Sequence, residues 1–324
     1  MGGIAVHIFL DVWSARASLP GGRSAFNPCS TQPCGAQRVA KVIHQTYKTD
    51  TLPPEWRATP AAWKRHHPGW RYMFWTDAKN RALVEKHYPE HLATYDAYPH
   101  AIQRADAARY FILHRYGGVY ADLDIRPERN IGPMLGDAQV LLPQTPNIGL
   151  TNAFMAAEKG HPFFAHVITQ LASYQHAWYH VMRHWEIVTS TGPTFIWSVF
   201  DRYPEEKKQG IVVVPAPVWG KCSICKTACR VTEYGNLRHL VGDSWHKWDS
   251  FIINYVILCN FVPLAITIYV IVSVFVSVRA AERKAGARWR PAARVGMVFN
   301  ALFTRETLVW VSVAVMCWHY KRRP

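Results

Sequence analysis

The sequence has few charged residues, few acids among them, and no glycine repeat. Charged residues make up 18% of the 324 positions, whereas 49% are apolar and 13% are aromatic. This balance excludes an intrinsically disordered chain, which would be poor in aromatic residues and rich in charge. The 19 glycines show no period of three, which excludes a collagen-like chain.

Acidic residues are outnumbered, because 22 Asp and Glu oppose 37 Lys and Arg for a formal net charge of +15. Such an excess suggests a nucleic acid or an anionic membrane surface as partner. However, residues 279–324 hold ten Lys and Arg against two Glu, so more than half of the net charge lies in this segment. The rest of the chain is only mildly basic, and we therefore expect no nucleic-acid partner.

One segment lacks charge altogether. Residues 250–278 form a run of 29 residues without Asp, Glu, Lys or Arg, and about 20 apolar residues suffice to cross a bilayer. We predict a transmembrane helix here, followed by a basic cytosolic loop at 279–294, so that the preceding body faces a lumen. A second hydrophobic segment at 295–319 is a possible second transmembrane helix, and 320–324 form a basic tail.

The N-terminus has no positively charged region of the kind that opens a signal peptide. Residues 1–38 are therefore predicted to be an irregular segment, and residues 39–249 a compact domain. In that domain, short apolar runs alternate with segments of helical periodicity. This alternation predicts an α/β fold with a mainly parallel sheet. The strands are expected at 39–43, 70–75, 119–123, up to Leu142 and at 211–214, and the helices at 54–66, 77–86 and 100–116.

The most informative motif is a pair of carboxylates, Asp122 and Asp124, at the end of a predicted strand. In an extended strand, residues two apart point to the same side. Two carboxylates on one side suit a hard divalent cation such as Mn²⁺ or Mg²⁺. Such a cation can hold a diphosphate, and the end of a strand is where open α/β sheets bind ligands.

The stretch around these carboxylates resembles the DXD-containing glycosyltransferases of family 32. The resemblance covers roughly residues 39–249 and depends on the order and spacing of four motifs. These motifs are IHQTYK at 43–48, WTD at 75–77, Asp106-x-x-Arg109, and Gly117-Gly118-Val-Tyr120-x-Asp122-x-Asp124.

The resemblance implies a GT-A-like, Rossmann-type nucleotide-sugar fold and a metal-dependent reaction with Mn²⁺ or Mg²⁺. Asp122 and Asp124 would bind the metal and the donor, and Arg109 would stabilise the leaving group together with them. Asp106, three residues before Arg109 on one helix face, would contact the donor. Further donor contacts are expected from His44, Gln45 and Tyr120, although Tyr120 could instead be a core aromatic.

Three later segments resemble the inositol phosphorylceramide mannosyltransferase branch of this family. They are PQTPNIGLTNAFMAAEKGHPFF at 143–164, TSTGPTF at 189–195 and GDSWHKWD at 242–249. The resemblance implies a late loop that closes on the diphosphate and metal, and residues that line the pocket or the acceptor side. The loop residues would be Ser244, Trp245 and, as a metal ligand, His246. The lining residues would be Asn152, Gly192 and Pro193, the last two of which could instead form an ordinary turn or helix start.

This branch implies a membrane-bound, retaining enzyme of the Golgi lumen that moves mannose from GDP-mannose to inositol phosphorylceramide. A small regulatory subunit is a possible partner. The alternatives are another family 32 enzyme that uses a UDP-sugar on a glycolipid or glycan, or a non-catalytic subunit that keeps the fold.

Overall fold

The computed structural model describes residues 35–146, 149–176, 180, 182–221 and 236–240. All of them belong to one compact unit, residues 1–249. Its centre is a six-stranded sheet with the strand order β2-β1-β3-β6-β5-β7. A two-stranded ribbon of β4 and β8 accompanies the sheet.

The strands of the large sheet are mostly parallel. β1 pairs in parallel with β2 and β3, and β5 pairs in parallel with β7, whereas β6 is antiparallel to both of its neighbours. Five strands therefore run in one direction and β6 runs against them, which confirms the predicted α/β fold with a mainly parallel sheet. The strands are β1 (Val42–Thr46), β2 (Arg71–Trp75), β3 (Gly118–Ala121), β4 (Ile125–Pro127), β5 (Val140–Pro143), β6 (Phe154–Ala157), β7 (Ile211–Val214) and β8 (Leu237–His239).

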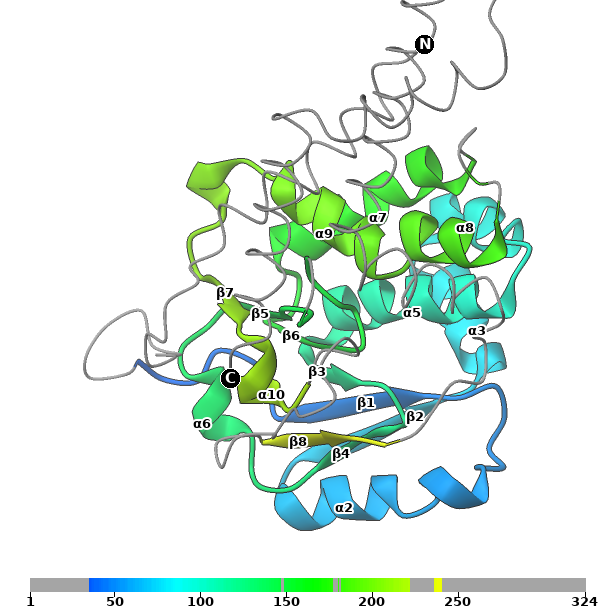
Figure 1. Cartoon of the computed structure of the whole chain (residues 1–324). Coiled ribbons are helices and arrows are strands. Elements are labelled where there is room, and N and C mark those ends of the chain that lie inside the picture. The colour runs from blue at the N-terminus through cyan, green and yellow to red at the C-terminus, as the bar shows by residue number, and fades with distance from the viewer. Residues whose placement is uncertain (1–34, 147–148, 177–179, 181, 222–235, 241–324) are drawn as a thin grey trace, which may run out of the picture. The chain divides into compact units, whose positions relative to one another are not determined.

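Helices cover both faces of the sheet, with α3, α5, α7, α8 and α9 on one side and α2 on the other (Figure 1). The α-helices are α2 (Thr59–His66), α3 (Asp77–His87), α4 (Leu92–Asp96), α5 (Ala101–Tyr116), α6 (Gly132–Leu135), α7 (Pro162–Gln175), α8 (Arg183–Ser190), α9 (Pro193–Asp201) and α10 (Ala216–Trp219). Three short 3-10 helices are η1 (Pro54–Trp56), η2 (Pro89–His91) and η3 (Glu205–Lys207).

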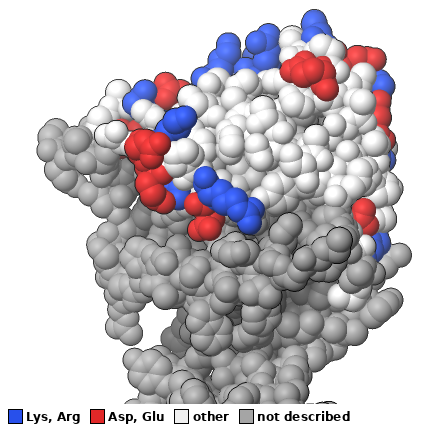
Figure 2. Space-filling view, turned by 90° about the horizontal axis from the view of Figure 1, so that it is seen from above, with Lys and Arg blue, Asp and Glu red and all other residues white. Residues whose placement is uncertain are grey.

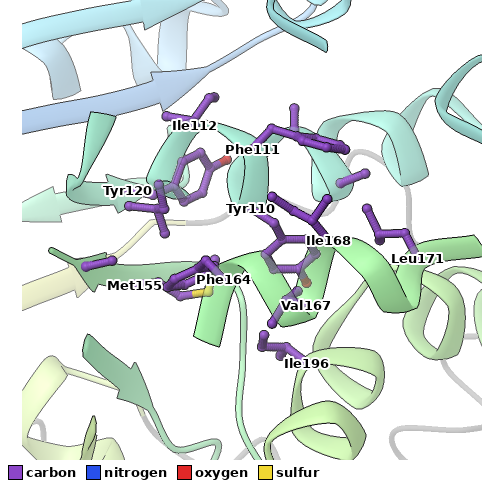
Figure 3. Close-up of a cluster of buried hydrophobic side chains, with 14 of the residues drawn as sticks. Tyr110, Phe111, Ile112, Tyr120, Met155, Phe164, Val167, Ile168, Leu171 and Ile196 are labelled. Atoms are coloured by element: carbon purple, nitrogen blue, oxygen red, sulfur yellow. The ribbon is translucent and has the colours of Figure 1, made fainter. Parts of the chain in front are cut away.

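The sheet separates two hydrophobic cores because neighbouring residues of a strand point to opposite faces. In β3, Tyr120 joins the core that lies under α5 and α7, whereas Val119 and Ala121 join the core under α2. In the first core, side chains of α5 such as Phe111 interlock with those of α7 such as Ile168 (Figure 3). These packed layers hold α5 rigidly against the sheet.

Most predicted elements are found, with shifted boundaries. The first strand runs to Thr46 rather than ending at Ile43, and the helix expected over 54–66 is split, since α2 begins only at Thr59. The central antiparallel strand β6 and the ribbon of β4 and β8 were not predicted. Their pairing depends on partners distant in the chain, so short runs such as FMAA at 154–157 carry no local signal for it.

Gly117 and Gly118 end α5, as predicted, and start β3. Gly118 has φ +90°, and a Cβ at this position would lie 2.5 Å from the carbonyl oxygen of Val42 in β1. A Cβ on Gly117 would lie 2.6 Å from the backbone nitrogen of Lys159. The chain can therefore pass from α5 into the central strand β3 only if both residues lack a side chain.

His44 lies at this junction and is fully buried. Its Nε2 is 2.9 Å from the carbonyl oxygen of Gly117 and therefore donates to it, and its Nδ1 accepts the indole N–H of Trp75 at 3.1 Å. Both ring nitrogens are thus used within the fold. The predicted donor contact of His44 is replaced by a structural role, because the ring joins β1, β2 and the end of α5.

The charged side chains on the face shown in Figure 2 are of both signs and surround a broad uncharged area. No continuous basic patch is seen over the described residues of this face. No helix in the described part of the chain is long and apolar enough to cross a membrane. The predicted membrane segments at 250–278 and 295–319, the loop and tail beside them, and most of the N-terminal segment 1–38 lie outside the described residues.

Replacing His44 with Gln should flatten the pH dependence of stability. Burial is the main reason that the pKa of His44 is lowered to about 4, whereas the unfolded chain binds this proton near pH 6.5. Protonation therefore favours the unfolded state, and the wild type should lose about 2 kcal/mol of stability from this group between pH 7 and pH 5. Urea denaturation of both proteins in detergent tests this, and equal pH slopes would contradict it.

Candidate functional site

The site is formed where β3 ends and β6 begins. Because these strands are antiparallel, with Ala121 opposite Phe154, the residues after β3 and before β6 lie at the same edge of the sheet. The backbone N–H of Asp122 donates to the carbonyl oxygen of Ala153 at 2.8 Å. Asp122 and Asn152 are thereby brought together although 30 residues separate them in the sequence.

Asp122 and Asp124 lie in a tight turn and not in an extended strand as predicted. β3 ends at Ala121, and the backbone N–H of Ile125 donates to the carbonyl oxygen of Asp122 at 2.9 Å. The strand rule for residues two apart therefore does not apply. On the other side of the turn, the backbone N–H of Leu240, the residue that follows β8, donates to the carbonyl oxygen of Asp124 at 2.7 Å.

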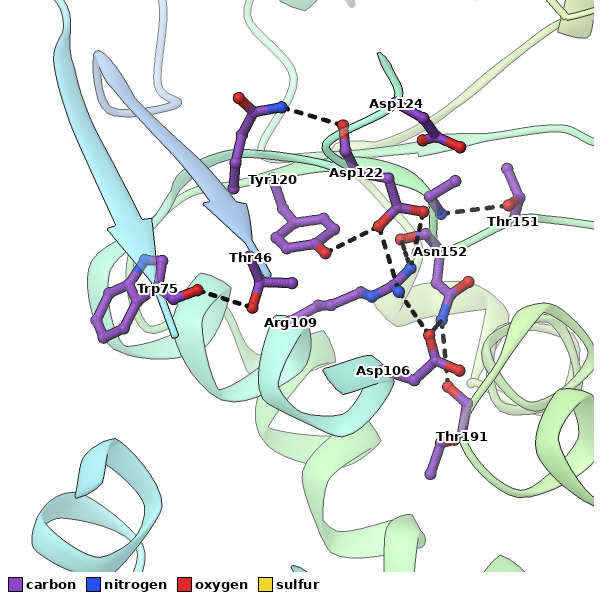
Figure 4. Close-up of polar contacts among 12 residues, drawn as sticks. Thr46, Trp75, Asp106, Arg109, Tyr120, Asp122, Asp124, Thr151, Asn152 and Thr191 are labelled. Carbon is purple, nitrogen blue, oxygen red and sulfur yellow. Dashed lines mark hydrogen bonds and ion pairs between the residues drawn. The ribbon is translucent and has the colours of Figure 1, made fainter. Parts of the chain in front are cut away.

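Arg109 of α5 is the central cation of the site (Figure 4). Its Nη2 lies 2.7 Å from Oδ1 of Asp106 and 3.2 Å from Oδ1 of Asp122. Its Nη1 donates to the backbone carbonyl of Asn152 at 2.9 Å and lies 3.4 Å from Oδ2 of Asp122. The side chain is only 5% exposed, so the predicted helix-face pair of Asp106 and Arg109 is a buried ion pair that also holds Asp122.

Tyr120 and Gln45 support Asp122 from the other sides. The Tyr120 hydroxyl donates to Oδ1 of Asp122 at 2.9 Å, and its ring lies 5.0 Å from the guanidinium carbon of Arg109. Gln45 donates through Nε2 to the carbonyl oxygen of Asp122 at 3.0 Å and accepts the Tyr72 hydroxyl at 2.9 Å. Both side chains are buried, so their predicted donor contacts are replaced by a role in positioning Asp122.

The predicted lining residues are placed behind the carboxylates. The Nδ2 of Asn152 donates to Asp106 at 3.1 Å and to the carbonyl oxygen of Thr191 at 3.3 Å. Gly192 is the N-cap of α9 and Pro193 its first residue, and a Cβ on Gly192 would come within 2.9 Å of Val188 Cα. Asn152 thus belongs to the buried network, and Gly192 and Pro193 form a helix start, which was the alternative interpretation.

Burial makes these carboxylates costly to ionise. It raises the pKa of Asp106 to about 7, although Arg109 opposes this shift. It also raises the pKa of Asp124 to about 7, with a further contribution from the negative charge of Asp122. The pKa of Asp122 is raised mainly by burial, and Arg109 counteracts the shift. Asp106 and Asp122 thus share one buried guanidinium, Asp124 lies close by without a contact to it, and the cluster favours a further cation.

The carboxylates fit a divalent metal ion. Oδ1 of Asp124 is buried and has no hydrogen-bond partner among the described residues, so it offers a free oxygen of the kind that Mn²⁺ and Mg²⁺ prefer. The side chains of Asp122 and Asp124 are 26% and 13% exposed, so both remain reachable from outside. Within the described part of the chain, no group of three or more His, Cys, Asp and Glu could hold a metal ion.

Two residues that sequence reasoning missed approach these carboxylates. Nε2 of His239, in β8, lies 3.9 Å from Oδ2 of Asp124. Lys221 lies after α10, and its positive charge lowers the pKa of both Asp122 and Asp124. No local motif marks either residue, since pairing of β8 with β4 and the turn after α10 bring them to the site. The predicted loop residues Ser244, Trp245 and His246 lie outside the described residues.

Replacing Arg109 with Met should destabilise the fold. The change leaves Asp106 and Asp122 buried without their cation, and removal of one partner from a buried ion pair costs about 3–5 kcal/mol. Arg115 on the same helix is exposed, so Arg115→Met is the matched control and should change stability by less than about 0.5 kcal/mol. Urea denaturation measures both, and similar small losses in the two variants would show that the buried pair contributes little.

The chain matches known protein families. Residues 53–145 match the family described as "Glycosyltransferase sugar-binding region containing DXD motif". Inositol phosphoceramide mannosyltransferase 3 of Schizosaccharomyces pombe is 31% identical over 82% of this chain and 70% of its own length. Inositol phosphoceramide mannosyltransferase 1 of the same organism is 33% identical over 68% of this chain and 66% of its length. The mannosyl phosphorylinositol ceramide synthase CSH1 of Saccharomyces cerevisiae is 35% identical over 66% of this chain and 54% of its length.

The chain therefore spans between 54% and 70% of the length of these relatives. A solved structure titled PaToxG Glycosyltransferase aligns with a TM-score of 0.39 and 16% identity over 50% of this chain and 69% of that chain. The region that matches the family model, residues 53–145, contains the predicted motif of Asp106, Arg109, Asp122 and Asp124. On the strength of the sequence matches, the chain belongs to the family of DXD-containing glycosyltransferases that includes the inositol phosphoceramide mannosyltransferases.

Proposed function

We propose that this protein is a metal-dependent mannosyltransferase that transfers mannose from GDP-mannose to inositol phosphorylceramide. The observation that carries the proposal is the pair of reachable carboxylates, Asp122 and Asp124, which a buried network holds at the carboxyl edge of the sheet. The choice of sugar and acceptor draws support from the names of the relatives, which are inositol phosphoceramide mannosyltransferases.

The mixed sheet with its DXD turn is what a GT-A-like nucleotide-sugar fold requires. Ligands of open α/β sheets bind outside the carboxyl ends of the strands, and Asp122 and Asp124 follow such an end. A divalent cation such as Mn²⁺ or Mg²⁺ held there would offset the charge of the leaving nucleoside diphosphate. Asp122 and Asp124 are the residues that would hold it.

The residues around Asp122 position its carboxylate for the donor. Arg109, Tyr120 and Gln45 fix the position of Asp122, so that its carboxylate need not reorganise when the donor binds. Asp106 holds Arg109 in place through the ion pair between their side chains. In the reaction, the bond between C1 of the sugar and its phosphate oxygen breaks, and the electron pair remains on that oxygen. The acceptor hydroxyl oxygen forms the new bond to C1 and loses its proton to the departing phosphate or to water.

The acceptor and the location are part of the proposal. The charge-free segment 250–278 follows the domain closely in the sequence, and an anchor there would keep the site near a lipid headgroup at the membrane surface. We propose that the domain faces the Golgi lumen, and that a small regulatory subunit can accompany it.

Two alternatives differ in their chemistry. A family member that uses a UDP-sugar would have the same carboxylates but a different nucleotide and sugar preference. A non-catalytic subunit would have no need for them. The presence of both carboxylates, with Asp122 held by Arg109 and Asp106 in one network, therefore favours an enzyme.

A donor panel tests the proposed reaction. The full chain in detergent is supplied with Mn²⁺, inositol phosphorylceramide and, in parallel, GDP-mannose, UDP-galactose, UDP-glucose and UDP-N-acetylglucosamine. We expect transfer from GDP-mannose alone and its loss when EDTA removes the metal. Transfer from a UDP-sugar would overturn the choice of donor, and transfer that persists in EDTA would overturn the metal requirement.

Replacing Asp124 with Asn should lower the transfer rate by at least about 100-fold, a loss typical of removing one transition-state charge contact. The amide has nearly the same shape but lacks the negative charge that a metal ion needs. The melting temperature should change little, because the Asp124 carboxylate makes no described hydrogen bond through Oδ1. The exposed Asp201 gives the matched control, Asp201→Asn. A normal rate in the Asp124 variant would refute its role.

A further inference from the structure

The proposed acceptor carries a negative charge of its own, and the inference that follows rests on the proposed function. In inositol phosphorylceramide, a phosphodiester joins the inositol ring to the ceramide. When a hydroxyl of that ring attacks C1 of the sugar, the phosphodiester lies within the width of one ring from the reacting atoms. A second anion so close to the donor diphosphate is unfavourable unless a cation offsets its charge.

Arg109 does not provide this cation. Its terminal nitrogens contact Asp106, Asp122 and the backbone carbonyl of Asn152, and its side chain is only 5% exposed. A guanidinium group held in this way positions the carboxylates and cannot reach a lipid headgroup. The phosphodiester of the acceptor needs a cation that is open to solvent and close to the carboxylate turn.

The ribbon of β4 and β8 carries two arginines beside this turn. β4 begins directly after Asp124, and its residue Arg126 pairs with Arg238 of β8. The pairing continues up to the turn, because the backbone N–H of Leu240 donates to the carbonyl oxygen of Asp124 at 2.7 Å. Each arginine is therefore two residues along its strand from the turn, which is about 7 Å at the usual rise per residue.

Both arginines project from the outer face of the ribbon. Residues directly opposite each other in an antiparallel pair share one face, with Cβ atoms about 5 Å apart. The alternate residues Ile125, Pro127 and Leu237 are buried, so the arginines lie on the other face. Arg238 is exposed, and the side chain of Arg126 is 32% exposed. The two guanidinium groups can therefore converge on one anion.

Two positive charges directly opposite each other destabilise a strand pair, and the ribbon offsets this repulsion only in part. Nη2 of Arg126 lies 2.9 Å from Oε1 of Glu128, so one of the two charges is paired. Arg238 forms no ion pair with a carboxylate of the described residues. The arginine pair thus retains a net positive charge in an accessible position, and a bound anion would relieve the repulsion.

We infer that Arg238 and Arg126 bind the phosphodiester of the acceptor headgroup. The planar guanidinium group matches two phosphate oxygens at once, and it is the side chain best suited to phosphate recognition. Held on the ribbon by its phosphodiester, the headgroup is directed to the carboxylate turn. In this role the arginines determine which acceptor binds and take no part in breaking the bond to C1.

Arg238→Gln should raise the KM for inositol phosphorylceramide by about tenfold, because a charge-assisted hydrogen bond to the phosphate is lost. The contact is the same before and during the reaction, so kcat should stay within about twofold. Arg238→Lys keeps a point charge and should recover part of the loss. Hydrolysis of GDP-mannose by water, measured without acceptor, should not change. The exposed Arg115 of α5 gives the matched control, Arg115→Gln.

The experiment uses the full chain in detergent, with Mn²⁺, GDP-mannose and inositol phosphorylceramide in mixed micelles. Two soluble probes compete with the lipid, namely glycerophosphoinositol, which has the phosphodiester, and myo-inositol, which lacks it. We expect glycerophosphoinositol to inhibit the wild type about tenfold more strongly than myo-inositol, and Arg238→Gln to abolish this difference. Melting temperatures show whether all variants fold.

A raised KM together with a lost preference for the phosphorylated probe in Arg238→Gln, and neither change in Arg115→Gln, supports the inference. Equal inhibition of the wild type by the two probes overturns it and leaves the proposed reaction standing. Parallel losses of lipid transfer and donor hydrolysis would indicate a purely structural arginine and also overturn it, as would an unchanged KM. If the wild type transfers no mannose to the lipid, the proposed function fails, and this inference fails with it.

Discussion

The structure of this site depends on one guanidinium group shared by two carboxylates. Arg109 is 2.7 Å from Asp106 and 3.2 Å from Asp122, and its positive charge offsets the cost of ionising both acids. Since Arg109 and Asp106 are fixed by α5 and Asp122 by the end of β3, the ion pair joins the helix to the edge of the sheet. The two hydrophobic cores hold these elements in place on either side.

Around this pair, the site has a buried supporting layer and a reachable one. His44, Gln45, Tyr120 and Asn152 have their polar groups satisfied inside the fold, and they fix the turn that carries the carboxylates. The reachable residues are those that are partly exposed to solvent, namely Asp122, Asp124, His239 and Lys221. Residues that a motif groups together can therefore act at different depths, and only those that are reachable can touch a donor.

The reachable layer explains why the cluster favours added positive charge. Burial and mutual repulsion raise the pKa of Asp124 to about 7, so its carboxylate is costly to ionise alone. A divalent cation relieves that cost, and the anionic donor then balances the cation.

The sequence alone determined the family motif and much of the fold, because these depend on local chemistry. Alternating apolar runs predict the parallel strands, Gly117 and Gly118 predict the end of α5, and the spacing of Asp106, Arg109, Asp122 and Asp124 predicts a DXD glycosyltransferase. Tertiary structure decided the rest. The antiparallel β6 brings Asn152 beside Asp122, burial gives His44 and Gln45 supporting roles, and pairing of β8 with β4 brings His239 beside Asp124. Such contacts join residues 30 to 115 positions apart, and they arise from packing and pairing that no local pattern encodes.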